Sequence, residues 1–160
     1  MKKEINLELY KKIVENIPIP SVDILIFNKK LDRTLLFLRN NSPAKNEYYS
    51  IGGRLVKGES FLEGALNNFN EETGIKLKEE SLHYIGIQDE FFKDSFFSEK
   101  VFTHNLNIYF AIKFEQDLKI KLDNQHSSSK WFKVNDKNLH PYMKEKIKKS
   151  LEYFENGKKE

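Results

Sequence analysis

The sequence predicts an α/β (α+β) fold in which a mixed β-sheet is sandwiched between helices. Three segments carry apolar residues at helical spacing, one near each end of the chain and one in the middle. Between them lie short apolar runs rich in β-branched and aromatic residues, several joined by short polar connections typical of hairpins. Strands in hairpins that are interrupted by helices favour a mixed sheet with helices packed against it.

The composition is that of a globular protein, and the chain of 160 residues is expected to form one domain over residues 1–160. A net charge of +3, with both signs interspersed, argues against a protein that binds nucleic acid through a strong field. The absence of cysteine excludes disulfides and thiolate chemistry. The N-terminus lacks the apolar core of a signal peptide, and no apolar run reaches membrane-spanning length. We therefore expect a cytoplasmic protein with neither nucleic-acid nor membrane partners.

The N-terminal part is expected to form a helix followed by two paired strands. The helix covers residues 5–17 and is ended by Pro18, because proline cannot continue a helix. The strands cover residues 21–27 and 33–38. A polar loop then leads to a brief strand over residues 48–51, which enters a pair of glycines.

A second helix is expected over residues 60–73. Ser60 is placed to cap its N-terminus, and Glu63 three residues later completes the pattern of a capping box. Gly74 is placed to end the helix. The apolar stripe expected to face the core consists of Leu62, Ala65, Leu66 and Phe69.

The C-terminal half is expected to begin with two long strands over residues 82–92 and 102–114, joined by a flexible hairpin. A last strand covers residues 130–134. An amphipathic helix over residues 139–156 ends the chain, and we expect its lysine-rich face to be solvated.

A spaced pattern of glycines and acids occupies the middle of the chain, in the segment GGRLVKGESFLEGALNNFNEETGI that starts at Gly52. Five residues separate Gly53 from Glu59, and seven separate Glu59 from Asn67. The pattern ends with Glu71-Glu72 and Gly74-Ile75. This spacing resembles the Nudix box, a loop–helix–loop that places carboxylates around a magnesium-bound pyrophosphate. The resemblance implies a Nudix fold with its box at residues 53–75, and Mg²⁺ or Mn²⁺ as the cofactor.

Helical geometry separates the acids of the box into two directions. Asn68 and Glu72 share one face at i, i+4 spacing next to the apolar stripe, whereas Glu71 points further towards solvent. Glu72 is therefore the expected metal ligand, and Glu71 is a helper or a surface residue. Asn67 and Asn68 replace the Arg-Glu pair of the box, so the site is suited to fewer metal ions, down to one. The same acids also fit a surface helix that follows a tight turn and binds nothing.

A second set of motifs lies outside the box. It consists of Ser21-Val22-Asp23, Leu38-Arg39 with Pro43-Ala44, Gly52-Gly53-Arg54, Phe102-Thr103-His104, and Asp123-Asn124-Gln125-His126 ahead of Trp131-Phe132. Over residues 20–132 the chain resembles the GDP-mannose mannosyl hydrolase branch of the Nudix family. Members of this branch direct water at the anomeric carbon and release GDP and a free sugar of inverted configuration. The resemblance implies magnesium-dependent hydrolysis of GDP-mannose or a related GDP-hexose by a homodimer.

The resemblance also implies catalytic and substrate-binding roles for four residues. His126 falls at the position of the general base, a task that suits imidazole. Arg39 falls where an arginine stabilises the leaving GDP, and Asp23 where a carboxylate stabilises positive charge on the sugar. Arg54 falls at a further substrate-contacting arginine.

The metal ligands implied by the resemblance are Glu72, Gln125 and the backbone carbonyl of Gly52. The branch also has two tyrosines where this chain has Asn105 and Ser129. These departures fall near the expected sugar or phosphates and leave the identity of the sugar open.

Several of these residues also fit structural roles. His126 stands in the polar stretch QHSSSK, which suits a loop histidine equally well. Asp23 interrupts an apolar strand, and pairing with Arg39 or Arg54 would explain it without a substrate. His104 is expected to pack within its strand.

Two other functions stay open. One is the conventional attack on phosphorus of a Nudix pyrophosphohydrolase, which the Glu71-Glu72 pair favours. The other is a catalytically silent module that binds a nucleotide sugar or a partner, which the loss of charge at Asn67 and Asn68 favours.

Overall fold

A computed structural model describes residues 5–114 and 126–157, and the side chains from residue 128 onwards in the second range. The helices in these ranges are α1 (Leu7–Asn16), α2 (Phe61–Thr73), α3 (Pro141–Asn156) and a 3₁₀ turn, η1 (Glu79–Ser81). The strands are β1 (Ile19–Asn28), β2 (Arg33–Arg39), β3 (Tyr48–Tyr49), β4 (Ile51–Arg54), β5 (His83–Phe92), β6 (Thr103–Phe114) and β7 (His126–Lys133). The described helices include none that is long and apolar enough to cross a membrane.

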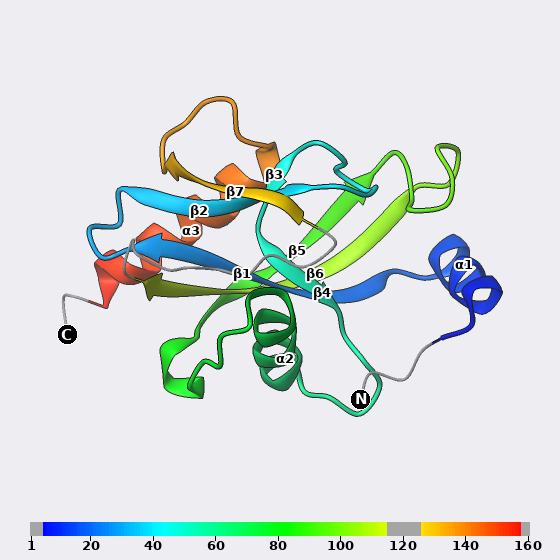
Figure 1. The fold of residues 1–160 in the computed structure, drawn as a ribbon, viewed down its shortest axis with the longest axis horizontal. Helices are drawn as coiled ribbons and strands as arrows, with labels where there is room; N and C mark the ends of the chain where they lie inside the picture. Colours follow the sequence, from blue (N-terminus) through cyan, green and yellow to red (C-terminus); the bar gives the residue numbers. More distant parts are fainter. Residues whose placement is uncertain (1–4, 115–125, 158–160) are drawn as a thin grey trace.

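The strands form one mixed sheet, as the sequence predicts. Five of them follow the order β3-β2-β1-β6-β5, while β4 pairs with β1 and β7 pairs with β2 (Figure 1). β1 runs parallel to β6, and the other pairings are antiparallel. A parallel pair needs a long connection, and the chain from β2 to β5, which includes α2, forms it between β1 and β6.

Helices cover both faces of the sheet, so the predicted α+β arrangement with a mixed sheet between helices is confirmed. Alternate residues of β1 point to opposite faces. Val22 and Ile24 belong to the apolar cluster that contains Phe69 of α2, whereas Leu25 belongs to the cluster that contains Met143 of α3. Fully burying one side chain of this size contributes roughly 1.5–3 kcal/mol, so the two clusters hold the helices on the sheet.

The local signals of α2 are confirmed in detail. Ser60 Oγ accepts a hydrogen bond from the backbone of Glu63 at 3.2 Å, and the Glu63 carboxylate accepts one from the backbone of Ser60 at 2.8 Å. Gly74 ends the helix in the left-handed conformation, with φ of 73°. The two ends of this helix are therefore fixed by its own sequence.

The expected strand over residues 48–51 is wrong, because two short strands with different partners occupy this region. β3 pairs with β2, and β4 pairs with β1. Ser50 lies between them, where the chain passes from one partner strand to the other. Other bounds shift slightly: α1 begins after an Asn6 cap, and β7 begins at His126 rather than at residue 130.

α1 lies at one end of the sheet, beside the loop that joins β5 to β6 (Figure 1). Tyr10 of α1 stacks on Phe96 of this loop, with ring centroids 5.3 Å apart. The guanidinium of Arg54 lies 5.4 Å from the centroid of the Tyr10 ring. These contacts bring α1 to the end of β4, where the glycine pair enters the box.

Candidate active site

A cavity of about 460 Å³ opens between α1, α2 and the sheet. Its walls contain every predicted site residue whose side chain is described. These residues are Asp23, Arg39, Gly52, Arg54, Glu71 and Glu72, and Asn105 joins them. The sequence places them on five different elements, so the fold assembles the site from distant parts of the chain.

The glycine pair of β4 allows the walls of the cavity to come close together. A Cβ atom on Gly52 would overlap the carbonyl oxygen of Val22 and would lie 2.5 Å from Oδ1 of Asp23. A Cβ atom on Gly53 would lie 3.2 Å from the side-chain oxygen of Asn68. β4 therefore fits between β1 and α2 because it has no side chains at these two positions.

Replacing Gly52 with alanine is expected to destabilise the protein by about 1–3 kcal/mol, because the new methyl group has no space beside β1. Urea unfolding measures this change. Gly157→Ala is the control, since its Cβ atom would make an ordinary contact of 3.6 Å and should change stability by less than about 0.5 kcal/mol. Equal stability of Gly52→Ala and wild type would show that β4 does not pack this closely.

The face of α2 that meets the cavity is the one that the sequence predicts. Glu72 is 6% exposed and Asn68 is 2% exposed, and both line the cavity. Glu71 is exposed and reaches the rim. Asn67 lies elsewhere and donates a hydrogen bond to Glu59 at 2.9 Å. Asn67, at the position of the box arginine, therefore joins the helix of the box to the loop that precedes it.

The donor set in the cavity fits a single divalent cation that takes most of its ligands from phosphate and water. Among the described residues, no group of three or more His, Cys, Asp or Glu side chains is arranged to hold a metal. Mg²⁺ bound with phosphate needs only one or two protein carboxylates. Glu72 is placed to provide one of these, and Glu71 and Gly52 also line the cavity. The expected ligand Gln125 lies outside the described residues.

Two arginines bring positive charge to the cavity. Arg39 donates a hydrogen bond through Nε to the carbonyl oxygen of Pro43 at 2.8 Å, which orients the guanidinium without using its Nη atoms. Arg54 lies over Tyr10, whose phenol pKa is raised by burial and lowered to a smaller extent by the arginine. Guanidinium groups in this setting are suited to forked hydrogen bonds with phosphate.

β7 brings the backbone of His126 to the same region. In the antiparallel pairing of β7 with β2, the Cα atom of His126 is the partner of that of Arg39. The side chain of His126 lies outside the described part of the structure. His126 thus begins a strand next to a residue that lines the cavity, and the alternative of a loop histidine is wrong for its backbone.

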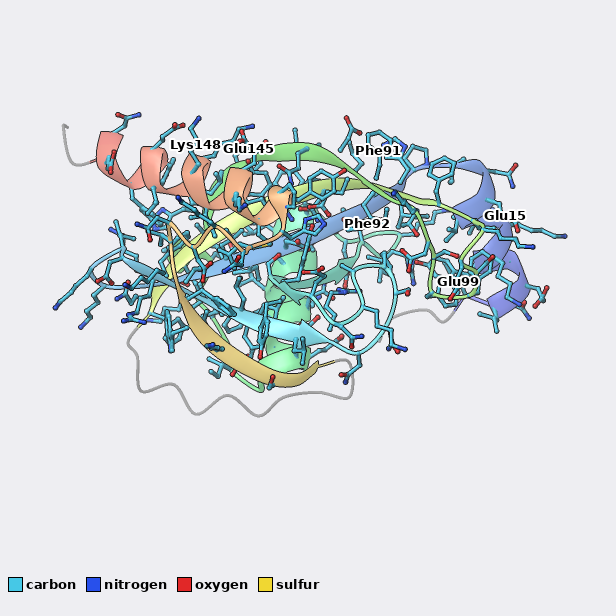
Figure 2. The ribbon with its side chains drawn as sticks, turned by 90° about the horizontal axis from the view of Figure 1, so that it is seen from above. Glu15, Phe91, Phe92, Glu99, Glu145 and Lys148 are labelled. Atoms are coloured by element: carbon cyan, nitrogen blue, oxygen red, sulfur yellow. The ribbon has the colours of Figure 1, made fainter. Side chains whose placement is uncertain are left out.

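His104 and Ser129 lie away from the cavity. His104 pairs with Asp89 at 2.8 Å and stacks on Phe91 with ring centroids 4.4 Å apart, which confirms that it packs within the sheet. Phe91 points away from the molecule, whereas Phe92, the next residue of β5, lines the cavity (Figure 2). Ser129 is exposed on β7.

The alternative in which Asp23 pairs with Arg39 or Arg54 is wrong, because Asp23 pairs with Lys146 of α3. The Lys146 ammonium lies 2.6 Å from Oδ2 of Asp23 and 2.6 Å from Oε1 of Glu90. The expectation of a solvated lysine-rich face holds for Lys148 (Figure 2), but Lys146 is completely buried.

Sequence reasoning missed Glu90 and Lys146, although Lys146 leaves a signal. Lys146 follows Met143 by three residues and so falls on the apolar stripe of α3. A charge at such a position needs a partner of opposite sign. Asp23 is a second buried charge in the sequence, so a search for oppositely charged residues at buried positions would have suggested the pair.

Comparison with known proteins identifies the family. A model of the NUDIX domain matches residues 18–154. The low-salt glycan biosynthesis protein Agl8 of Haloferax volcanii is 31% identical over 134 residues, which are 84% of this chain and 83% of that protein.

Solved structures share the fold. The MutT protein from Methanosarcina mazei has a TM-score of 0.65 and 22% identity, with 91% of this chain and 99% of that chain covered. The NUDIX domain of Shewanella oneidensis NrtR, complexed with ADP ribose, has a TM-score of 0.66 and 15% identity, with 94% and 99% covered. The family match, the box at the edge of the cavity and the shared fold agree: the chain belongs to the Nudix hydrolase family.

Proposed function

We propose that the protein hydrolyses a GDP-sugar, GDP-mannose or a related GDP-hexose, to GDP and free sugar by water attack at the anomeric carbon. The observation that supports this most is the composition of one cavity. It contains two arginines suited to a diphosphate, Glu72 suited to a metal ion, and the carboxylate Asp23 deeper in the fold. The same four side chains match the motifs of the GDP-mannose mannosyl hydrolase branch.

The leaving-group side of the reaction is assigned to Arg39, Arg54 and the metal site. Nudix hydrolases generally use a divalent metal ion. Glu72, with Gln125 and the Gly52 carbonyl, would hold Mg²⁺ or Mn²⁺, which neutralises charge on the departing diphosphate. Arg39 and Arg54 donate hydrogen bonds to the phosphate oxygens, so that GDP leaves as a stabilised anion.

The sugar side is assigned to Asp23 and His126. Cleavage of a glycosidic C–O bond places positive charge on the sugar ring, which a nearby carboxylate stabilises. Water attacks the opposite face of the anomeric carbon as the bond to the β-phosphate oxygen breaks. His126 accepts the proton that the water loses, so the products are GDP and a sugar of inverted configuration.

Agl8, the relative from Haloferax volcanii, is named for glycan biosynthesis. This name supports a sugar-containing substrate for the present protein. One observation favours a second candidate, attack on phosphorus, since both Glu71 and Glu72 line the cavity. That reaction would release GMP and a sugar phosphate.

The nucleotide product tests the proposal. The protein is incubated with GDP-mannose and MgCl₂, and the nucleotides are separated by anion-exchange chromatography. GDP supports the proposed reaction, and GMP contradicts it in favour of attack on phosphorus. Binding of GDP-mannose without turnover, measured by calorimetry, would instead indicate a silent binding module. A parallel set with other GDP-hexoses and with ADP-ribose identifies the preferred sugar and base.

We also propose that the protein acts as a homodimer, which is the state implied by the resemblance to GDP-mannose mannosyl hydrolase. Light scattering coupled to gel filtration at micromolar concentration measures the mass directly. A mass near 38 kDa, twice the 19.0 kDa of the chain, is expected, and a mass near that of one chain would contradict the proposal.

A further inference from the structure

Lys146 links α3 to two carboxylates on the floor of the cavity. Its side chain is completely buried, and those of Asp23 and Glu90 are 11% and 2% exposed. The rings of Tyr49 and Tyr109 lie 5.1 and 5.7 Å from its nitrogen and complete the enclosure. Asp23 and Glu90 both line the cavity, so Lys146 holds two cavity residues without lining the cavity itself.

The need to pack α3 does not explain a charged group at this position. The remaining buried stripe of α3 consists of Met143, Ile147, Ser150 and Phe154. Apolar residues of similar volume often replace a buried ion cluster with no loss of stability. Burial on its own lowers the pKa of Lys146, but the two carboxylates raise it by more, so the ammonium stays charged.

The bonds to Asp23 fix the orientation of its carboxylate. Lys146 and the Ser50 hydroxyl both donate to Oδ2, at 2.6 and 2.7 Å. Oδ1 lies on the side of Gly52, where a Cβ atom would come within 2.5 Å of it. Two donors on one oxygen and the glycine backbone beside the other leave the carboxylate little freedom to rotate.

Glu90 is held by a separate set of groups. Its Oε1 accepts hydrogen bonds from the Tyr49 hydroxyl at 2.8 Å and from the Gln88 amide at 3.1 Å, in addition to the Lys146 contact. Burial and the neighbouring carboxylates raise the pKa of the Tyr49 phenol, so Tyr49 remains a donor. Glu90 thus gives Lys146 a second carboxylate partner besides Asp23.

We propose that Lys146 is a positioning residue, which together with Glu90 forms a clamp that holds the Asp23 carboxylate towards bound sugar and balances part of its charge. This inference rests on the proposed function, in which Asp23 stabilises positive charge on the sugar. Lys146 acts through Asp23 and does not touch the substrate. The carboxylates of Asp23 and Glu90 both contact Nζ of Lys146. Without this ammonium they would repel each other, and the Asp23 carboxylate would turn away.

Steady-state kinetics with the full chain test the clamp. Lys146→Met is expected to lower kcat by about 100-fold and to change KM by less than about threefold. The reason is that a misplaced Asp23 carboxylate no longer stabilises the positive charge on the sugar, which develops mainly in the transition state. Lys148→Met is the matched control, since Lys148 points away from the sheet on the outer side of α3 (Figure 2), and it should retain wild-type kcat. A Lys146→Met kcat within about threefold of wild type would overturn the clamp.

A double variant separates charge coupling from a general loss of structure. Glu90→Gln alone is expected to lower kcat several-fold, but in the Lys146→Met background it should raise kcat by about tenfold, because it removes the repulsion on Asp23. A purely structural role predicts that the second change lowers kcat in both backgrounds. Ser50→Ala, which removes only the other bond to Oδ2, should lower kcat several-fold and provides a test if Lys146→Met folds poorly.

The failure of the clamp and the failure of the proposed function are distinguishable. The nucleotide product of the wild-type protein decides the function, whereas the kcat ratios, on whichever nucleotide sugar the wild type hydrolyses, decide the clamp. A crystal structure of Lys146→Met or of Ser50→Ala gives a readout that needs no substrate. Rotation of the Asp23 carboxylate away from Gly52 supports the clamp, and an unchanged orientation overturns it.

Discussion

Replacing Glu72 with glutamine is expected to lower metal-dependent turnover by about 100-fold or more, which is the scale for losing one electrostatic contact in a transition state. Glu72 is buried on the cavity wall, and the described residues offer no cluster of three or more carboxylates or histidines to compensate. A neutral amide is a weaker ligand than a carboxylate for a hard cation. The concentration of Mg²⁺ that gives half-maximal activity should also rise.

Glu71→Gln is the matched control for Glu72→Gln. Glu71 is adjacent in sequence and has the same chemistry, but its side chain is exposed at the rim of the cavity. Its replacement should therefore weaken Mg²⁺ activation much less. A metal titration in which Glu71→Gln is the more damaged variant would contradict the assigned helix face.

Replacing His126 with glutamine is expected to lower kcat by about 10²–10⁴-fold, the contribution typical of a general base. Glutamine preserves hydrogen bonding but does not accept the proton that the attacking water loses. The metal site is assigned to other residues, so the affinity for Mn²⁺, measured by electron paramagnetic resonance, should stay close to that of the wild type.

His104→Gln is the control for His126→Gln. His104 lies outside the cavity, paired with Asp89 and stacked on Phe91, so its loss should leave kcat unchanged. Wild-type turnover by His126→Gln would remove this residue from the reaction. A large loss in His104→Gln would show that the outer face of β5 and β6 takes part.

Elements with local signals were predictable from the sequence. The ends of α2 follow from the Ser60–Glu63 capping box and from Gly74, which act within a few residues of one another. The separation of Glu71 from Glu72 follows from the rotation of a helix per residue. β3 and β4 were not separable, because their break at Ser50 depends on two different partner strands that lie elsewhere in the sequence.

The ion pair on the floor of the cavity was likewise not predictable from local signals. Asp23 was recognisable as a costly charge in an apolar strand, but its partner lies 123 positions away, on the last helix. The sequence pattern pointed instead to Arg39 and Arg54 as partners of Asp23, because these arginines end the neighbouring strands β2 and β4. Lys146 was grouped with the solvated lysines of α3, since composition does not distinguish one lysine of a helix from the next unless the apolar stripe is followed residue by residue.

The two candidate reactions differ in which bond to oxygen breaks. Attack at the anomeric carbon cleaves the bond between carbon and the β-phosphate oxygen, so that oxygen leaves with GDP. Attack on phosphorus leaves it on the sugar phosphate. Asp23 and its clamp are suited to the first reaction, because a carboxylate stabilises a cationic sugar but repels an anionic phosphoryl centre.

Hydrolysis of GDP-mannose in H₂¹⁸O, followed by mass spectrometry of the products after a single turnover, is the most direct test of attack at carbon. We expect ¹⁸O in the free sugar and unlabelled GDP. Label in the phosphate of GMP or of mannose phosphate would contradict it and would establish attack on phosphorus.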